Sequence, residues 1–80
     1  MTEEEKNLIL KDSTELRNFF ESRGYNVIIS NIDNHLAMYR ITFIQKEIFT
    51  DAEMLIINDL VFLIARRLHL VIFISFEHNI

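Results

Sequence analysis

The sequence predicts an α+β fold with the element order αββαβ, in which a three-stranded sheet carries two helices packed on one face. Three observations lead to it. Two long segments have the apolar periodicity of helices, and each begins with a helix-capping pattern. The segments that follow each helix are rich in β-branched and aromatic residues, as strands are. A chain of 80 residues has the length of one domain, so we interpret residues 1–80 as a single domain.

The first helix is predicted at about residues 3–23. Thr2 and Glu5 have the spacing of a capping box, and the acidic first turn suits the positive end of the helix dipole. Gly24 is the expected stop, because glycine readily adopts the backbone conformation that ends helices. The apolar stripe of this helix consists of Leu8, Ile9, Leu16, Phe19 and Phe20.

An alternative start for the first helix stays open. Asp12 falls inside the apolar stripe and makes a second plausible capping box with Glu15. If the helix began there, residues 7–11 could form a short strand. The architecture would then be a ferredoxin-like βαββαβ fold.

A hairpin is predicted between residues 25 and 44, with Asp33-Asn34 as its turn pair. This turn places Ile28 opposite Tyr39 and divides the two strands between two faces. The face assigned to the core carries Ile28, Ile32, Ala37, Tyr39, Ile41 and Phe43. The outer face carries Val27, Ile29, Leu36, Met38, Arg40 and Thr42.

The second helix is predicted at about residues 51–68, opened by a capping box of Thr50 and Glu53. Its core stripe is Met54, Ile57, Leu60, Val61, Ile64 and Leu68, widened by Ile56 and Leu63. Leu55 and Phe62 interrupt the polar side. A helix that is apolar on nearly every side is normally covered on nearly every side, so we expect one flank to need a further partner.

The last strand is predicted from Leu70 to about Glu77, with alternate residues on two faces. Leu70, Ile72, Ile74 and Phe76 are assigned to the core, which leaves Val71 and Phe73 on the outer face. The right-handed crossover rule makes this strand parallel to the second one, either beside it or with the first strand between them.

Two apolar surfaces are therefore expected to remain uncovered, one on the outer sheet face and one on the second helix. Because a monomeric domain rarely exposes a large continuous apolar patch, we expect both to take part in association. The predicted interface residues are Ile29, Met38, Arg40, Val71 and Phe73 on the sheet, with Leu55 and Phe62 on the helix.

Composition favours binding over chemistry. A single glycine and no cysteine leave no Gly-rich phosphate loop and no thiolate metal site, and the three histidines lack the spacing of metal ligands. We therefore predict no catalytic residue, no cofactor, no metal and no small-molecule substrate. The apolar runs are interrupted by charged residues, so no membrane span is expected, and the acidic start is unlike an export signal. We expect a cytoplasmic protein.

The function predicted from these features is a small, non-enzymatic protein–protein interaction module. We expect a homodimer that acts as an adaptor, regulator or inhibitor of a larger protein. The alternative is a nucleic-acid-binding domain of the RNA-recognition type, with Phe73 and Tyr25 as stacking platforms on an open sheet. A net charge of −4 makes nucleic acid the weaker expectation.

Overall fold

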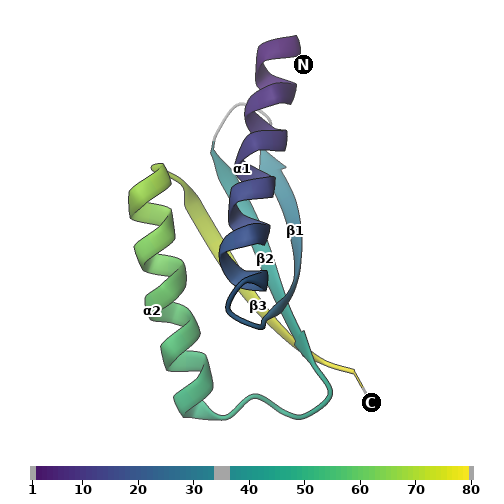
Figure 1. Ribbon diagram of the computed structural model, residues 1–80, viewed down its shortest axis with the longest axis vertical. Helices are drawn as coiled ribbons and strands as arrows, with labels where there is room; N and C mark the ends of the chain where they lie inside the picture. Colours follow the sequence, from purple (N-terminus) through teal and green to yellow (C-terminus); the bar gives the residue numbers. More distant parts are fainter. Residues whose placement is uncertain (1, 34–36, 80) are drawn as a thin grey trace.

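The computed structural model describes residues 2–33 and 37–79, which form two helices and one sheet (Figure 1). The elements in chain order are α1 (Glu3–Glu21), β1 (Asn26–Asp33), β2 (Met38–Gln45), α2 (Asp51–Leu68) and β3 (Val71–His78). The predicted order αββαβ is confirmed. Residues 7–11 are helical, so the ferredoxin-like alternative is wrong.

Helix α1 begins at the capping signal in the sequence and ends shortly before the predicted stop. The side chain of Thr2 caps its N-terminus, with Oγ1 accepting a hydrogen bond of 3.2 Å from the Glu5 backbone N–H. The helix ends at Glu21, two residues before the predicted end. Gly24 has a φ of +86°, a left-handed conformation that glycine adopts without steric cost, and there the chain turns toward β1.

Helix α2 carries a complete capping box. Thr50 Oγ1 accepts from the Glu53 backbone N–H at 3.1 Å, and Glu53 Oε1 accepts from the Thr50 backbone N–H at 3.0 Å. The second bond lowers the pKa of the Glu53 carboxyl, because it favours the charged form. At the other end His69 is left-handed, and Leu70 donates to the Ala65 carbonyl at 2.9 Å, which closes the helix and leads directly into β3.

The sheet has the strand order β1-β2-β3 (Figure 1). Strand β2 pairs with β1 in antiparallel and with β3 in parallel orientation. Of the two predicted arrangements, the one with β3 directly beside β2 is therefore correct. β2 is the central strand, and β1 and β3 are the two edges in the described part of the chain.

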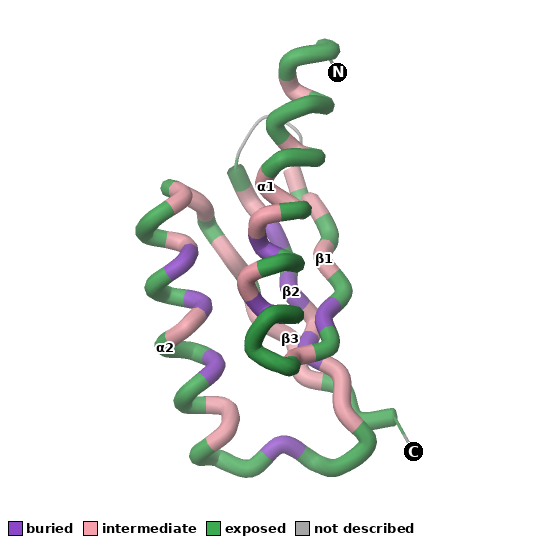
Figure 2. Tube along the Cα trace, viewed as in Figure 1, coloured by how far each residue is buried: buried purple, intermediate pink, exposed green. Residues whose placement is uncertain are grey.

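The core lies on the face of the sheet that we call the inner face. The β2 residues Tyr39, Ile41 and Phe43 are only 2%, 0% and 1% exposed. Both helices contribute buried residues to this one cluster. They are Leu16 and Phe20 from α1 and Ile57, Val61 and Ile64 from α2. Figure 2 marks the buried positions along the chain.

Aromatic rings fill the part of the core beneath the C-terminal end of α1. The Phe20 ring meets the Phe43 ring edge to face, with 5.1 Å between centroids, and Tyr25 packs on both at 6.3 and 5.8 Å. The centroid of the Phe76 ring of β3 lies 5.9 Å from that of the Phe43 ring. Such offset contacts stabilise aromatic pairs beyond the area that they bury.

The predicted register of the hairpin is wrong by an odd number of residues. Val27 pairs with Phe43 and Ile29 with Ile41, so these two β1 residues belong to the inner face. The β1 residues assigned to the core, Ile28 and Ile32, are instead exposed on the opposite face, and Ala37 is an exposed turn residue.

The physical reason is the length of the connection. Asp33 is the last residue of β1 and pairs with Met38, so it does not form a two-residue turn with Asn34, which lies outside the described residues. The register also shifts between Asn31 and Asp33. Because side chains alternate with a period of two, an odd slip transfers a whole strand to the other face.

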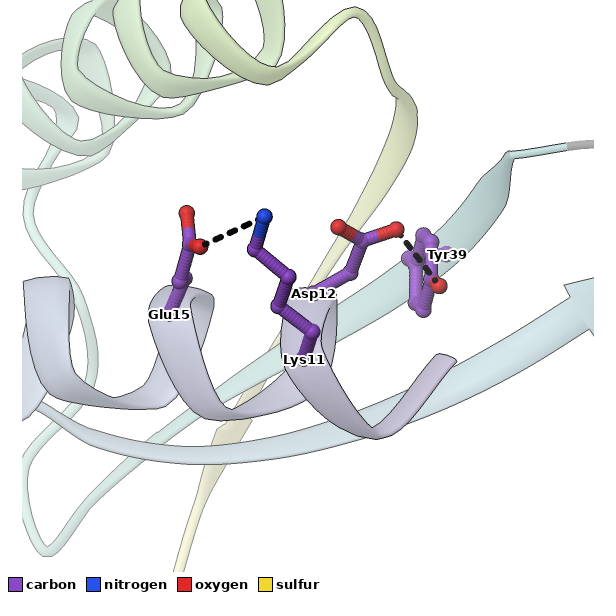
Figure 3. A network of polar contacts seen from close by, with 4 residues as sticks. All are labelled: Lys11, Asp12, Glu15 and Tyr39. Atoms are coloured by element: carbon purple, nitrogen blue, oxygen red, sulfur yellow. Dashed lines mark hydrogen bonds and ion pairs between the residues drawn. The ribbon is translucent and has the colours of Figure 1, made fainter. Parts of the chain in front are cut away.

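Asp12, the residue that interrupted the apolar stripe of α1, is also explained. The Tyr39 hydroxyl donates a hydrogen bond of 3.2 Å to Asp12 Oδ2, joining α1 to the central strand (Figure 3). On the neighbouring turn Lys11 forms an exposed ion pair with Glu15, with 4.0 Å between Nζ and Oε1. Asp12 can face the sheet because the Tyr39 hydroxyl gives its carboxylate a hydrogen-bond donor.

The Tyr39 phenol should titrate at high pH. Burial raises its pKa to about 12, and the charge of Asp12 and the hydrogen bond to it act in the same direction. In a Tyr25→Phe background, where Tyr39 is the remaining tyrosine, the phenolate absorbance should appear near that pH. Adding Asp12→Ala should lower the midpoint yet leave it above the ordinary 10.0. A midpoint at 10.0 in the parent background would contradict this packing.

The same shift sets a pH dependence of stability. The folded protein holds the Tyr39 proton more tightly than the unfolded chain, so this contribution is complete below pH 10.0 and is lost as the pH rises through about 12. We expect the unfolding free energy, measured with urea, to decrease over that interval. The Tyr39→Phe variant should show a shallower decrease.

Candidate interaction surfaces

The sheet face opposite the core, which we call the outer sheet face, exposes a group of large side chains. Ile28 is 52% exposed and Phe73 45%, although both lie within strands. Arg40 pairs with Phe73 across β2 and β3 and with Ser30 across β2 and β1. By their register, the larger residues of this face are Ile28, Met38, Arg40, Ile44, Val71 and Phe73, and the exposed Ile32 lies beside them at the register shift of β1.

Most of the residues predicted for this face are on it, and some are not. Met38, Arg40, Val71 and Phe73 lie where they were expected. Ile29 does not, because the corrected register turns it toward the core. Val27 is buried for the same reason, and Leu36 lies outside the described residues.

Ile28 and Ile32 take the places of the two misassigned residues. No sequence signal separated the two alternatives, since Val27, Ile28 and Ile29 are consecutive β-branched residues that suit either face. The outer sheet face therefore carries the predicted residues of β2 and β3 but different residues of β1.

A second apolar surface lies on the outward side of α2. Leu55 and Phe62, both predicted as interface residues, are 63% and 66% exposed. Ile56 and Leu63 were expected to widen the core stripe, but they are exposed as well. Burial on α2 is narrow and passes through Ile57, Val61 and Ile64, so much of the apolar surface of this helix has no cover within the described chain.

A groove of about 740 Å³ runs between α2 and β3. Its helix side is formed by residues including Asp59, Phe62 and Arg66, and its strand side by residues including Ile72 and Ile74. A second hollow of about 700 Å³ lies on α2 and shares the same three helix residues. Asp59, Phe62 and Arg66 thus form a ridge between two depressions, which we call the α2 ridge.

The two charges of the α2 ridge have no partner in the described part of the chain. No hydrogen bond or ion pair involves the side chain of Asp59 or Arg66 there, whereas Arg17 and Glu21 on α1 form an ion pair at 3.7 Å. Asp59 and Arg66 are both exposed. Their charges are therefore available to another molecule.

Residues 2–33 and 37–79 contain no candidate metal site. No group of three histidine or acidic side chains there could hold an ion, and the chain has no cysteine. His69 closes α2 and His78 ends β3, while His35 lies outside the described residues.

Tyr25 is not where a nucleic-acid-binding sheet would need it. Its ring packs against Phe20 and Phe43 in the core cluster instead of standing on the outer sheet face. Of the two predicted stacking platforms, only Phe73 is on that face.

Neither helix, in the residues that the structure describes, is long and apolar enough to cross a bilayer. Comparison of the chain with protein-family models, with curated proteins and with solved structures finds no match.

The corrected register makes a paired prediction for neighbouring residues of β1. Ile29→Glu places a charge against the core and should lower the unfolding free energy by on the order of 3 kcal/mol. Ile28→Glu places the same charge on the exposed face and should cost less than about 1 kcal/mol. Urea unfolding followed by circular dichroism measures both. If Ile28→Glu were the more destabilising of the two variants, the result would support the register predicted from the sequence, in which Ile28 faces the core.

Proposed function

We propose that this chain is a small, non-enzymatic protein–protein interaction module. It works as a homodimer and docks on a larger protein, which it serves as an adaptor, regulator or inhibitor. The observation that carries the proposal is the outer sheet face, where Ile28 of β1 and Val71 and Phe73 of β3 remain about half exposed on either side of the central strand β2. Contiguous apolar exposure of this kind marks sites of association.

The chemistry of the outer sheet face suits a protein partner. Met38, Arg40 and Phe73 belong to the residue types that are enriched in the centres of protein interfaces. A partner would bring apolar side chains to the isoleucines and an acceptor, such as a carboxylate, to the Arg40 guanidinium. The flat sheet would present these groups on a rigid frame.

Two further observations support this functional class and its location. Among the described residues, no group of three histidine or acidic side chains could hold a metal ion. The absence of cysteine suits a reducing compartment, and we place the module in the cytoplasm on that ground.

Nucleic-acid binding by the same face is the second candidate. The pairing of Arg40 with Phe73 favours it, because a cation beside an exposed ring can hold a phosphate next to a stacked base. The net charge of −4 and the position of Tyr25 in the core weigh against it. A salt-sensitive gel shift of a mixed oligonucleotide pool would favour this candidate over a protein partner.

Capture experiments with matched variants test the leading proposal. Immobilised parent protein should retain a partner protein that Ile28→Glu and Phe73→Glu lose by roughly tenfold or more, because a charge is placed in an apolar contact. Leu10→Glu is the matched control, since Leu10 is even more exposed than Ile28 and Phe73 but lies on α1. Equal capture by all four proteins, or no partner at all, would contradict docking through this face.

A further inference from the structure

We propose that the α2 ridge and the free edge of β3 form the homodimer interface, with a second copy of this chain as the occupant of the groove. This inference rests on the proposed homodimer and names its surface. It leaves the outer sheet face of each copy available for the larger partner. Three features support this interface: an unpaired edge of β3, a pattern of charge on α2 that is complementary to itself, and a single two-fold axis that suits both elements.

The free edge of β3 can accept another strand. The Val71 N–H donates to the Ala37 carbonyl at 2.8 Å and the Asn79 N–H to the Gln45 carbonyl at 2.7 Å, so the odd-numbered residues of β3 face β2. Backbone groups alternate along a strand, which directs those of Ile72, Ile74 and Phe76 away from β2. No strand pairs with that edge among the described residues.

The sequence of β3 does not protect this edge. Val71 to Ser75 contains no proline and no charge, and the pairing with β2 runs without a bulge from Val71 to His78. An unprotected edge of this composition is normally covered, because it would otherwise pair with other chains without control. A second β3 in antiparallel orientation provides the cover.

The α2 ridge is complementary to itself in charge. Asp59 and Arg66 are seven residues apart, which puts them on one side of the helix and about 10 Å apart along its axis. When two copies of α2 pack antiparallel, Asp59 of one copy faces Arg66 of the other, and the reverse contact forms by symmetry. The level midway between them is that of Phe62, whose exposed ring would meet its own symmetry mate.

Strand and helix agree on the position of the two-fold axis. Phe62 lies about 10 Å from the turn at His69, from a rise of about 1.5 Å per residue. Phe73 lies a similar distance along β3 from the same turn, at about 3.3 Å per residue, and α2 and β3 run in opposite directions (Figure 1). An axis through the level of Phe62 therefore also passes near Phe73.

This pairing makes one continuous sheet from two chains. Ile72 of one copy exchanges hydrogen bonds with Ile74 of the other, and the two Phe73 side chains become neighbours on the outer face. The outer sheet faces of both copies then join into one larger surface. A larger protein would meet a symmetric site of twice the width.

Charge reversal tests the proposed pairing between copies. Asp59→Arg and Arg66→Glu should each raise the dimer dissociation constant by roughly tenfold or more, because like charges then face each other. In a heterodimer of Asp59→Arg and Arg66→Glu, the introduced arginine faces the introduced glutamate. The native Arg66 of the first variant also faces the native Asp59 of the second, so both contacts join opposite charges. An equimolar mixture of the two variants should regain the dimer mass in light scattering as a heterodimer.

The control is Arg67→Glu, the same change one residue along the helix. Arg67 lines the hollow between α1 and α2 with Glu15 and Ile64. It also borders the second hollow on α2, but it does not line the groove beside β3 that the second copy is proposed to occupy. This variant should remain dimeric alone and should not restore the dimer of Asp59→Arg when the two are mixed. Circular dichroism of every variant establishes that the helices are intact.

Hydrogen exchange tests the strand edge separately. In the dimer the amides of Ile72 and Ile74 should exchange roughly tenfold or more slowly than in Phe62→Glu, which we expect to be monomeric. The Phe73 amide, which is bonded to β2, should be protected in both proteins. Fast exchange of Ile72 and Ile74 in a dimeric parent would exclude the β3 edge from the interface.

The outcomes separate this inference from the proposed function. A dimeric parent whose mass is unaffected by the charge reversals, or whose mixture gives no heterodimer, overturns the interface and leaves the homodimer standing. A parent that is monomeric at all concentrations overturns both the interface and the homodimer, and leaves the β3 edge for a strand of another protein. Loss of capture by Ile28→Glu is independent of either result, because Ile28 lies on β1, on the far side of β2 from the β3 edge.

Discussion

The central strand β2 determines how the whole molecule is arranged. It is bonded to a neighbour on both sides, so its side chains can only stand above or below the sheet. Tyr39, Ile41 and Phe43 stand on the inner face and contribute the most completely buried surface of the sheet. Both helices place their buried residues in the cluster around these three side chains, and Asp12 of α1 accepts the Tyr39 hydrogen bond within the same contact. The alternation along β2 therefore separates the core from the outer sheet face.

The elements could be predicted because their signals are local. Thr50 and Glu53 mark the start of α2 by their spacing, and Gly24 marks the turn after α1 by its backbone freedom. The register of β1 could not be predicted in this way. Val27, Ile28 and Ile29 suit either face, so register depended on the hairpin connection, whose length the residues Asp33-Asn34 did not reveal. The patch on the outer sheet face survived the error because β2 and β3 contribute Met38, Arg40, Val71 and Phe73 independently of β1. The unpaired charges of the α2 ridge were visible as residues, but their importance needs the groove beside β3, which only the fold brings together.

The apolar surface left outside the core is the link between this fold and its proposed role. Half of the residues are hydrophobic, yet a domain of 80 residues can enclose only a modest core. Three strands cover one side of that core, and the narrow buried stripe of α2 covers part of the other. The remainder is divided between the outer sheet face and the outward side of α2. A second copy on the α2 ridge would cover one of these surfaces and enlarge the other, which gives each surface a separate role in association.

We propose that the native fold is completed by burial between two copies of the chain. The concentration dependence of the thermal unfolding midpoint tests it most directly, because a fold stabilised by dimerisation becomes more stable by mass action as protein is added. We expect a midpoint that rises steadily with protein concentration and a folded species of twice the 9.6 kDa chain mass. A midpoint that does not change with concentration, together with the mass of a single chain, would contradict it.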